Sequence, residues 1–312
     1  MAANRPPILV RGLREAIDRV LTRARLIRDL LLPGGRTFRY GPHRSQRGEL
    51  HLPSGSGPHP LVVLIHGGSW QKRYSKLVMR ALARDLRRRG WAVWNIEYRR
   101  IGAGGGWPET FADVGAAVDH VRALEAPLDH SRVSVVGHSA GGHLALWAAG
   151  REALPPRAPG APAAGGPIRF AGAVALAGVC DLATAHREWR GGAVERLLGG
   201  SPAEVPEHYA LADPLAQVPL PMPVLLAHGV HDQTVSVRLS RNYARAARAA
   251  GGEVELIELE GEGGDHRAHI DPRSGAWAAV VEWLGRLAGE PGEPRRREQQ
   301  NAPVTPGFPK GP

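Results

Sequence analysis

The chain has 312 residues, of which 43% are hydrophobic, enough to form a sizeable core in one large α/β domain or two smaller domains. Its 40 glycines and 27 prolines fall below the proportions of disordered or collagen-like chains. A single cysteine, Cys180, excludes an intramolecular disulfide and a cysteine-based metal site. Cys180 ends an apolar segment, so we expect a buried thiol that acts as a small hydrophobic side chain.

The formal net charge of +10 is concentrated near the N-terminus. Residues 1–50 hold eleven arginines against four acidic residues, whereas residues 51–288 together carry only +2. A basic excess favours polyanions or anionic membranes, but here it belongs to one segment. No apolar stretch is long enough to cross a membrane, and no signal-peptide core is present. The sequence therefore predicts a cytoplasmic protein with no nucleic-acid partner and no stable membrane insertion.

Residues 1–35 form the first predicted unit. Apolar residues recur there at three- and four-residue steps between positions 8 and 32, the pattern of an amphipathic helix, which Pro33 ends. Such a helix can lie on an anionic surface, dock on the protein body or form part of a cap, and of these we expect docking. Residues 40–52 are predicted to form an antiparallel strand.

Strand-like and helix-like segments alternate from residue 61 onwards, which indicates a mostly parallel sheet with helices on both faces. The predicted strands are 61–66, 91–98, 132–137, 170–179, 223–229 and 253–259. The predicted helices are 75–89, 111–125, one from 140, 235–250 and 272–288. Two further segments interrupt or end this rhythm: a helical insertion at 181–218 and a disordered tail at 289–312.

The strongest local motif is Gly137-His138-Ser139-Ala140-Gly141, a G-x-S-x-G between a predicted strand and a predicted helix. This context is typical of a nucleophile elbow, a turn too tight for Cβ atoms beside the serine. The amino end of the following helix also favours negative charge at this point. The motif occurs in ordinary small-residue turns as well, but its position here favours Ser139 as a nucleophile.

A serine hydroxyl needs a base that is itself held by an acid, and in elbow enzymes the acid and then the base follow the serine along the chain. Asp232 follows the predicted strand at 223–229, and His266 follows the strand at 253–259. The carboxyl ends of parallel strands open on one edge of a sheet. We therefore expect Ser139, Asp232 and His266 to meet at that edge.

Other residues compete for these roles. Asp213 precedes its strand and is followed by a proline, which favours a turn, while His269 lies close enough to His266 to remain an alternative base. The histidines of these loops match no zinc-binding spacing, so no metal site is predicted. They are His228, His231, His266 and His269.

The segment His66-Gly67-Gly68-Ser69-Trp70 follows the first buried strand. Acyl transfer creates an oxyanion that backbone N–H donors must approach to about 3 Å. Glycines allow that approach, so we predict an oxyanion hole formed by Gly67, Gly68 and Ser69 together with the amide of Ala140. Ser69 itself has no base placed near it by the pattern.

Two tryptophans, Trp70 and Trp107, follow core strands and either line a substrate pocket or pack at the sheet edge. The arginines of residues 97–100 bind an acidic substrate or form ion pairs with Glu97 or Asp113. No phosphate-binding loop and no flavin or nicotinamide signature occurs, so no cofactor is predicted.

Taken together, six segments resemble the α/β-hydrolase superfamily. They are HGGSW (66–70), EYRR (97–100), GGGWPETFADV (104–114), GHSAGGHLALW (137–147), HGVHDQTV (228–235) and GDHRAHIDP (264–272). Within the superfamily they resemble the esterase/lipase branch with an HGG oxyanion motif, and most closely the kynurenine-formamidase-like and prolyl-oligopeptidase-like hydrolases.

This resemblance covers about residues 40–288. It implies a catalytic domain at 36–288 with an eight-stranded, mostly parallel sheet, and a small helical cap at 181–218. It also implies Ser139 as nucleophile, Asp232 as acid and His266 as base. The residue before His266 is Asp265, where many relatives have glycine, which leaves His269 open as the base.

The leading hypothesis is a serine hydrolase that cleaves small carboxylic esters or aryl formamides through an acyl-enzyme. A serine peptidase-like amide hydrolase is the alternative chemistry. A different class, a membrane- or polyanion-binding module, rests on the basic residues 1–50. The natural substrate and the oligomeric state cannot be read from the sequence.

Overall fold

A computed structural model describes residues 34–162 and 166–289 of the chain. The amphipathic helix predicted within residues 1–35 and the tail predicted at 289–312 therefore lie outside the described residues, except for Gly34, Gly35 and Gly289. The helix proposed for the basic N-terminal segment therefore stays a prediction from the sequence.

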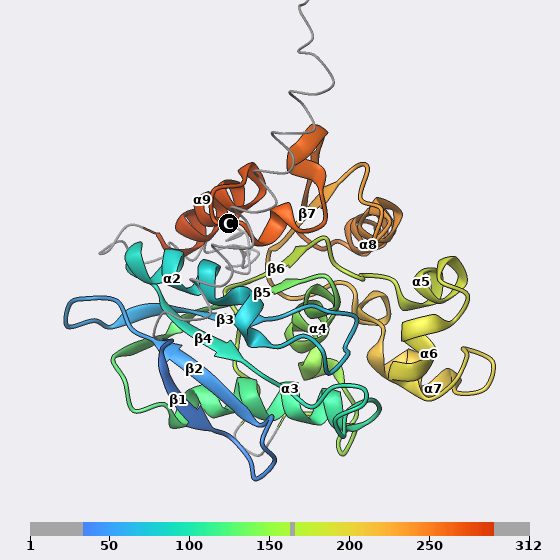
Figure 1. Ribbon diagram of the computed structural model, residues 1–312, viewed down its shortest axis with the longest axis horizontal. Helices are drawn as coiled ribbons and strands as arrows, with labels where there is room; N and C mark the ends of the chain where they lie inside the picture. The colour runs from blue at the N-terminus through green and yellow to red at the C-terminus, as the bar shows by residue number, and fades with distance from the viewer. Residues whose placement is uncertain (1–33, 163–165, 290–312) are drawn as a thin grey trace, which may run out of the picture.

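An eight-stranded sheet forms the centre of the molecule (Figure 1), in the order β1-β2-β4-β3-β5-β6-β7-β8. The two strands at one edge are antiparallel to their neighbours, and all other pairs are parallel. The bounds are β1 (Arg36–Arg39), β2 (Arg47–His51), β3 (His59–Ile65), β4 (Ala92–Ile96), β5 (Leu128–His138), β6 (Gly172–Leu176), β7 (Val224–Gly229) and β8 (Val254–Leu259). The predicted α/β-hydrolase architecture is confirmed.

The antiparallel strand predicted within residues 40–52 is present as β2, which begins at Arg47. A strand that was not predicted, β1, precedes it at residues 36–39 and pairs with it antiparallel. The chain reverses between them because the Tyr40 N–H donates to the Gln46 carbonyl and the Gln46 N–H donates to the His43 carbonyl. Gly41 and Pro42 occupy this turn, and these are the residue types that interrupt strands.

Helices cover both faces of the sheet, and alternation along each central strand serves both cores. On β3, Leu61, Val63 and Ile65 face one core while Val62 and Leu64 face the other. The first core includes side chains of α3 (Glu109–Asp119), α4 (Ala140–Ala149) and α8 (Val237–Ala249). The second includes side chains of α2 (Arg80–Arg88) and α9 (Gly275–Ala288).

Three short helices and a 3₁₀ turn lie between β6 and β7, within the insertion predicted at 181–218. They are α5 (Leu182–Glu188), α6 (Gly192–Leu198), α7 (Pro206–Ala212) and η4 (Pro214–Gln217). Two side chains of α4 hold the end of α7: His143 Nε2 donates to the Ala212 carbonyl and Trp147 Nε1 to the Leu211 carbonyl, both at 2.9 Å. The insertion is therefore tied to the helix that follows the G-x-S-x-G motif.

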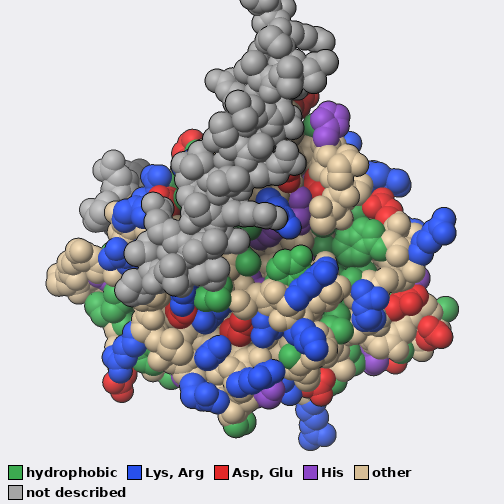
Figure 2. Space-filling view, in the orientation of Figure 1, with side chains coloured by type: hydrophobic (Ala, Val, Ile, Leu, Met, Phe, Trp, Pro, Cys, Tyr) green, Lys and Arg blue, Asp and Glu red, His purple; other side chains and the backbone are tan. Residues whose placement is uncertain are grey.

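Charged side chains of both signs are interspersed on the face seen in Figure 2. This distribution agrees with the small net charge calculated for residues 51–288. Over the described ranges, every helix falls short of the length and apolarity needed to cross a membrane.

Candidate active site

Ser139 occupies a strained turn between β5 and α4, as the motif predicts. Its φ of 57° and ψ of −123° lie in a region that side-chain-bearing residues rarely adopt. A Cβ built on Gly137 would overlap the Gly141 carbonyl, and one built on Gly141 would overlap the Ile65 carbonyl. The Ser139 N–H donates to the Leu176 carbonyl at 2.8 Å, and this hydrogen bond fixes the turn to the end of β6. Close main-chain packing therefore explains both flanking glycines.

Asp232 and His266 meet in the structure. Asp232 Oδ2 lies 2.6 Å from His266 Nδ1, although the two residues come from loops after different strands. The side chain of Asp232 is fully buried, whereas that of His266 remains 11% exposed. A carboxylate at Nδ1 fixes the proton on that nitrogen and leaves Nε2 as the free base.

Asp232 is held as a carboxylate. Burial opposes its charge, but His228 at 3.6 Å and the hydrogen bonds from His266 and the Val235 N–H hold the pKa of Asp232 well below its ordinary value. Its Oδ1 also accepts from the Thr234 N–H at 2.8 Å. The loop after β7 thus orients the carboxylate before any substrate arrives.

Among the described residues, no hydrogen bond joins Ser139 to this pair. In the part of the chain that the structure describes, Ser139 Oγ makes no hydrogen bond. The contact between the Ser139 turn and the loop that carries His266 is made by the residue before Ser139, since the His138 and His266 rings lie 4.7 Å apart. Such serine–histidine contacts often close only when substrate binds.

The competing residues have other partners. Asp213 accepts from the N–H groups of Leu182, Ala183 and Leu215, so its carboxylate joins the start of α5 to η4. His269 is completely buried, and its Nδ1 donates to the Asp265 carbonyl at 3.0 Å. The structure thus places His266, and not His269, against Asp232.

The loop after β3 lies against the elbow. A Cβ on Gly67 would lie 2.9 Å from Ser139 Cβ, and one on Gly68, whose φ is +115°, would overlap the Tyr74 ring. Ser69 and Trp70 also have positive φ values. The hydrogen bonds found among the described residues include none donated by the main-chain N–H groups of Gly68, Ser69 or Ala140. These amides are free to meet an oxyanion.

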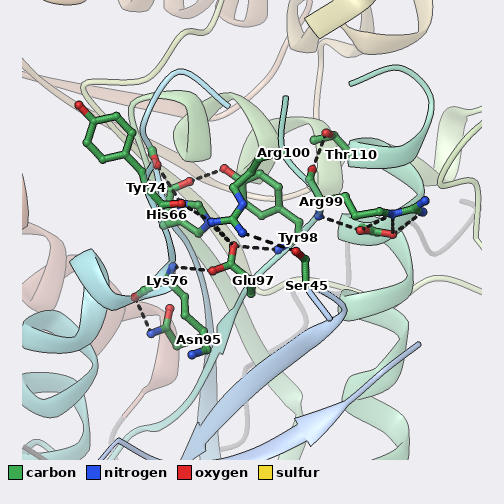
Figure 3. A network of polar contacts seen from close by, with 12 residues as sticks. Ser45, His66, Tyr74, Lys76, Asn95, Glu97, Tyr98, Arg99, Arg100 and Thr110 are labelled. Carbon is green, nitrogen blue, oxygen red and sulfur yellow. Dashed lines mark hydrogen bonds and ion pairs between the residues drawn. The ribbon is translucent and has the colours of Figure 1, made fainter. Parts of the chain in front are cut away.

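A buried polar network holds His66 at the start of the HGG loop (Figure 3). The ring of His66 is held at both nitrogens: Nδ1 donates to the Gly67 carbonyl, and Nε2 lies 2.8 Å from Glu97 Oε1. Tyr98 stacks on the same ring at 4.4 Å, and its hydroxyl donates to the His66 carbonyl at 2.8 Å. Burial raises the pKa of Tyr98, so the hydroxyl keeps the proton that it donates.

Ion pairs and amide hydrogen bonds complete the network. Glu97 pairs with Arg100 at 3.2 Å and accepts from the N–H groups of Lys76 and Tyr98. Arg99 pairs with Asp113 at 2.8 Å. The sequence left the arginines of the EYRR segment either to bind an acidic substrate or to form ion pairs, and the structure shows the ion pairs.

The two tryptophans predicted near the site are engaged in packing. Trp70 is fully buried and meets the His143 ring edge-on at 5.4 Å. The ring of Trp107 stacks on His208 of the insertion at 4.7 Å, and the main-chain N–H of Trp107 donates to the Leu197 carbonyl. Trp107 thereby joins the loop after β4 to the insertion, and a role for either ring in substrate binding remains a prediction.

Sequence reasoning missed the support of the HGG loop by Glu97 and Tyr98. A signal was available, because the HGG and EYRR segments follow two predicted strands of one parallel sheet. The structure pairs these strands, β3 and β4, directly. Reading the two segments as neighbours would have suggested the contact between His66 and Glu97.

The fold and these loops define a member of the α/β-hydrolase superfamily, with a strained turn at Ser139, a hydrogen-bonded Asp232–His266 pair and an HGG loop at the carboxyl ends of parallel strands. The chain belongs to the family whose model is described as BD-FAE, which matches residues 49–246. The predicted membership of the esterase/lipase branch of the superfamily is confirmed.

Two proteins that are named as esterases are similar to this chain. Esterase LipC of Mycobacterium tuberculosis is 28% identical over 66% of this chain and 53% of its own length. A probable isoprenylcysteine alpha-carbonyl methylesterase of Arabidopsis thaliana, ICMEL1, is 26% identical over 73% of this chain and 50% of its own length. The chain thus spans about half the length of these curated relatives.

A solved structure shares the fold. The thermophilic esterase Est2 of Thermogutta terrifontis superposes with a TM-score of 0.64 and 23% identity, covering 80% of this chain and 90% of that one.

Proposed function

We propose that this chain is a serine hydrolase that cleaves small carboxylic esters through an acyl-enzyme. The observation that carries the proposal is the 2.6 Å contact between Asp232 and His266 beside the strained turn of Ser139. The esterase names of LipC and ICMEL1 support an ester as the substrate class. Aryl formamides, which also contain an acyl carbon open to attack, are the second substrate class to test.

In this mechanism Ser139 Oγ attacks the acyl carbonyl carbon while His266 Nε2 accepts its proton. Asp232 stabilises the imidazolium that forms. The negative charge on the former carbonyl oxygen is met by the Ala140 N–H and by that of Gly68 or Ser69, at the amino end of α4. His266 then gives the proton to the leaving alcohol, and water repeats the sequence to release the acid.

The size of the acyl group is a finer part of the proposal. Est2 of Thermogutta terrifontis has been solved with propionate and with butyrate bound. Short acyl chains are accordingly the first substrates to test here. The insertion and Trp107, which joins it to the loop after β4, would form the cap that limits chain length.

A direct test compares the wild-type chain with Ser139→Ala. The wild type should hydrolyse p-nitrophenyl acetate and be labelled by a fluorophosphonate probe, and the variant should do neither. Hydrolysis by Ser139→Ala at the wild-type rate would overturn the proposal. A panel of acetyl, butyryl and octanoyl esters and an N-formyl aromatic amine then ranks the substrate classes.

A further inference from the structure

His138 contacts all three parts of the proposed site. It precedes Ser139 at the end of β5, and only 6% of its surface is exposed. Its Nε2 lies 2.9 Å from the carbonyl oxygen of His266. A Cβ built on Gly67 would lie 3.1 Å from His138 Nδ1, so the other side of the ring faces the HGG loop. The ring therefore lies between the base loop and the oxyanion loop.

The base loop, defined here as residues 265–270, makes few hydrogen bonds to the protein body, although His269 is completely buried and Ile270 packs against the second core. Most hydrogen bonds of its described residues are internal, such as those from the Ala268 N–H and His269 Nδ1 to the Asp265 carbonyl. One hydrogen bond joins the loop to the next residue of the chain, from the Asp271 N–H to the Ala268 carbonyl. The two that join it to other elements are both made by His266, whose ring binds Asp232 and whose carbonyl binds His138. The first orients the ring, and the second fixes the main chain that carries it.

The chemistry of the contact sets the protonation of His138. A carbonyl oxygen only accepts, so His138 Nε2 carries the proton and donates it. Burial, together with the nearby His266, lowers the pKa of His138 to about 3. The ring is neutral at neutral pH, and it therefore adds no positive charge beside His266 when that residue becomes an imidazolium.

We propose that His138 is a positioning residue that donates to the His266 carbonyl and thereby holds the base at the distance Ser139 requires. This inference rests on the proposed function. It assigns a purpose to the residue before the nucleophile, which the G-x-S-x-G pattern leaves unspecified: a donor on that side chain connects the rigid elbow to a loop at the edge of the sheet. A misplacement of about 1 Å at a catalytic group can cost a hundredfold in rate.

The test uses two substitutions of similar length in the full chain. Gln in His138→Gln retains an N–H donor that can reach the carbonyl, whereas Met in His138→Met fills similar space without a donor. We expect His138→Met to lower kcat for p-nitrophenyl acetate by about tenfold to a hundredfold with KM nearly unchanged, and the fluorophosphonate labelling rate to fall in parallel. We expect His138→Gln to recover most of both rates.

A matched control separates positioning from a general loss of stability. His143 is likewise a buried histidine that donates a 2.9 Å hydrogen bond to a carbonyl, but to Ala212 of the insertion. His143→Met should lower the melting temperature about as much as His138→Met while changing kcat far less. Equal kcat losses in both variants would overturn the inference.

Wild-type kcat in His138→Met would also overturn it, as would a His138→Gln variant no more active than His138→Met. The proposed function fails by a different result, activity in Ser139→Ala, so the two failures come from different variants and cannot be confused.

Discussion

The Ser139 turn and the base loop are neighbours, yet different kinds of contact hold them. The turn follows a central strand, β5, and its glycines press main chain on main chain. The base loop follows β8, a partly exposed strand at the edge of the sheet, and is connected to the body by hydrogen bonds of side chains. The first arrangement tolerates no added atom, whereas the second is sensitive to the loss of a donor or of a charge.

The largest effect expected is a loss of kcat on substitution in the base loop, and it distinguishes the two histidines of that loop. His266→Ala should lower kcat by about ten-thousandfold, because it removes the group that contacts Asp232. His269→Gln should retain most of the activity, since His269 bonds within its own loop. Steady-state kinetics on p-nitrophenyl acetate decide between them, and the reverse ranking would transfer the role of base to His269.

The next prediction concerns the side-chain network behind the HGG loop. Glu97→Gln should reduce the free energy of unfolding by about 3 to 5 kcal/mol, because buried Arg100 loses its charge partner. The control is Glu255→Gln, which breaks an ion pair with Arg286 that is about half exposed and should cost less than about 1 kcal/mol. Urea denaturation measures both, and similar losses would contradict the importance assigned to the buried network.

Because main chain packs directly on main chain at the Ser139 turn, we expect that adding even one methyl group there destabilises the fold. Gly141→Ala should destabilise the fold by about 3 kcal/mol, because its Cβ would overlap the Ile65 carbonyl. Gly285→Ala is the matched control, since that helical position has no atom within 4 Å of a Cβ. It should stabilise the protein by about 0.5 to 1 kcal/mol. A tolerated alanine at 141 would show that the elbow can relax.

The smallest effect expected is a pH dependence from Asp213, which joins two segments of the insertion through its carboxylate. Burial and the nearby Asp181 raise the pKa of Asp213 to about 6, against the influence of its amide hydrogen bonds. The folded state therefore holds this proton more tightly than the unfolded state. The stabilisation is complete below about pH 4 and is lost as the pH rises through 6, with a change of about 2 kcal/mol between pH 4 and pH 6 and about 3 kcal/mol in total.

Urea denaturation of the wild type and of Asp213→Asn between pH 4 and 7 checks this component, which the variant should lack. Asp129 provides a comparison of opposite sign. Burial opposes its charge, but hydrogen bonds from Ser131 and Arg132 lower its pKa, so its contribution is lost as the pH falls. Parallel stability curves for the wild type and Asp213→Asn would contradict the prediction.

Much of the fold followed from local pattern. Buried strands that alternate with amphipathic helices predicted a parallel sheet, and each of these predicted strands is present. The strand β1 was not predicted, and the strand predicted at 40–52 included the turn at 40–46, because that turn is closed by main-chain hydrogen bonds that composition does not reveal. The charge of residues 1–50 retains its sequence-based interpretation, since residues 1–33 lie outside the described residues.

The sequence by itself determined the position of Ser139, because a tight strand-to-helix turn demands glycine at fixed neighbouring positions. It favoured His266 as the base but left His269 open, since the two residues have the same chemistry within one loop. Only the tertiary structure placed His266 on Asp232 and brought His138 and Glu97 to the adjoining loops. The reason is physical: steric limits on the main chain leave a local motif, whereas hydrogen bonds between distant side chains leave none.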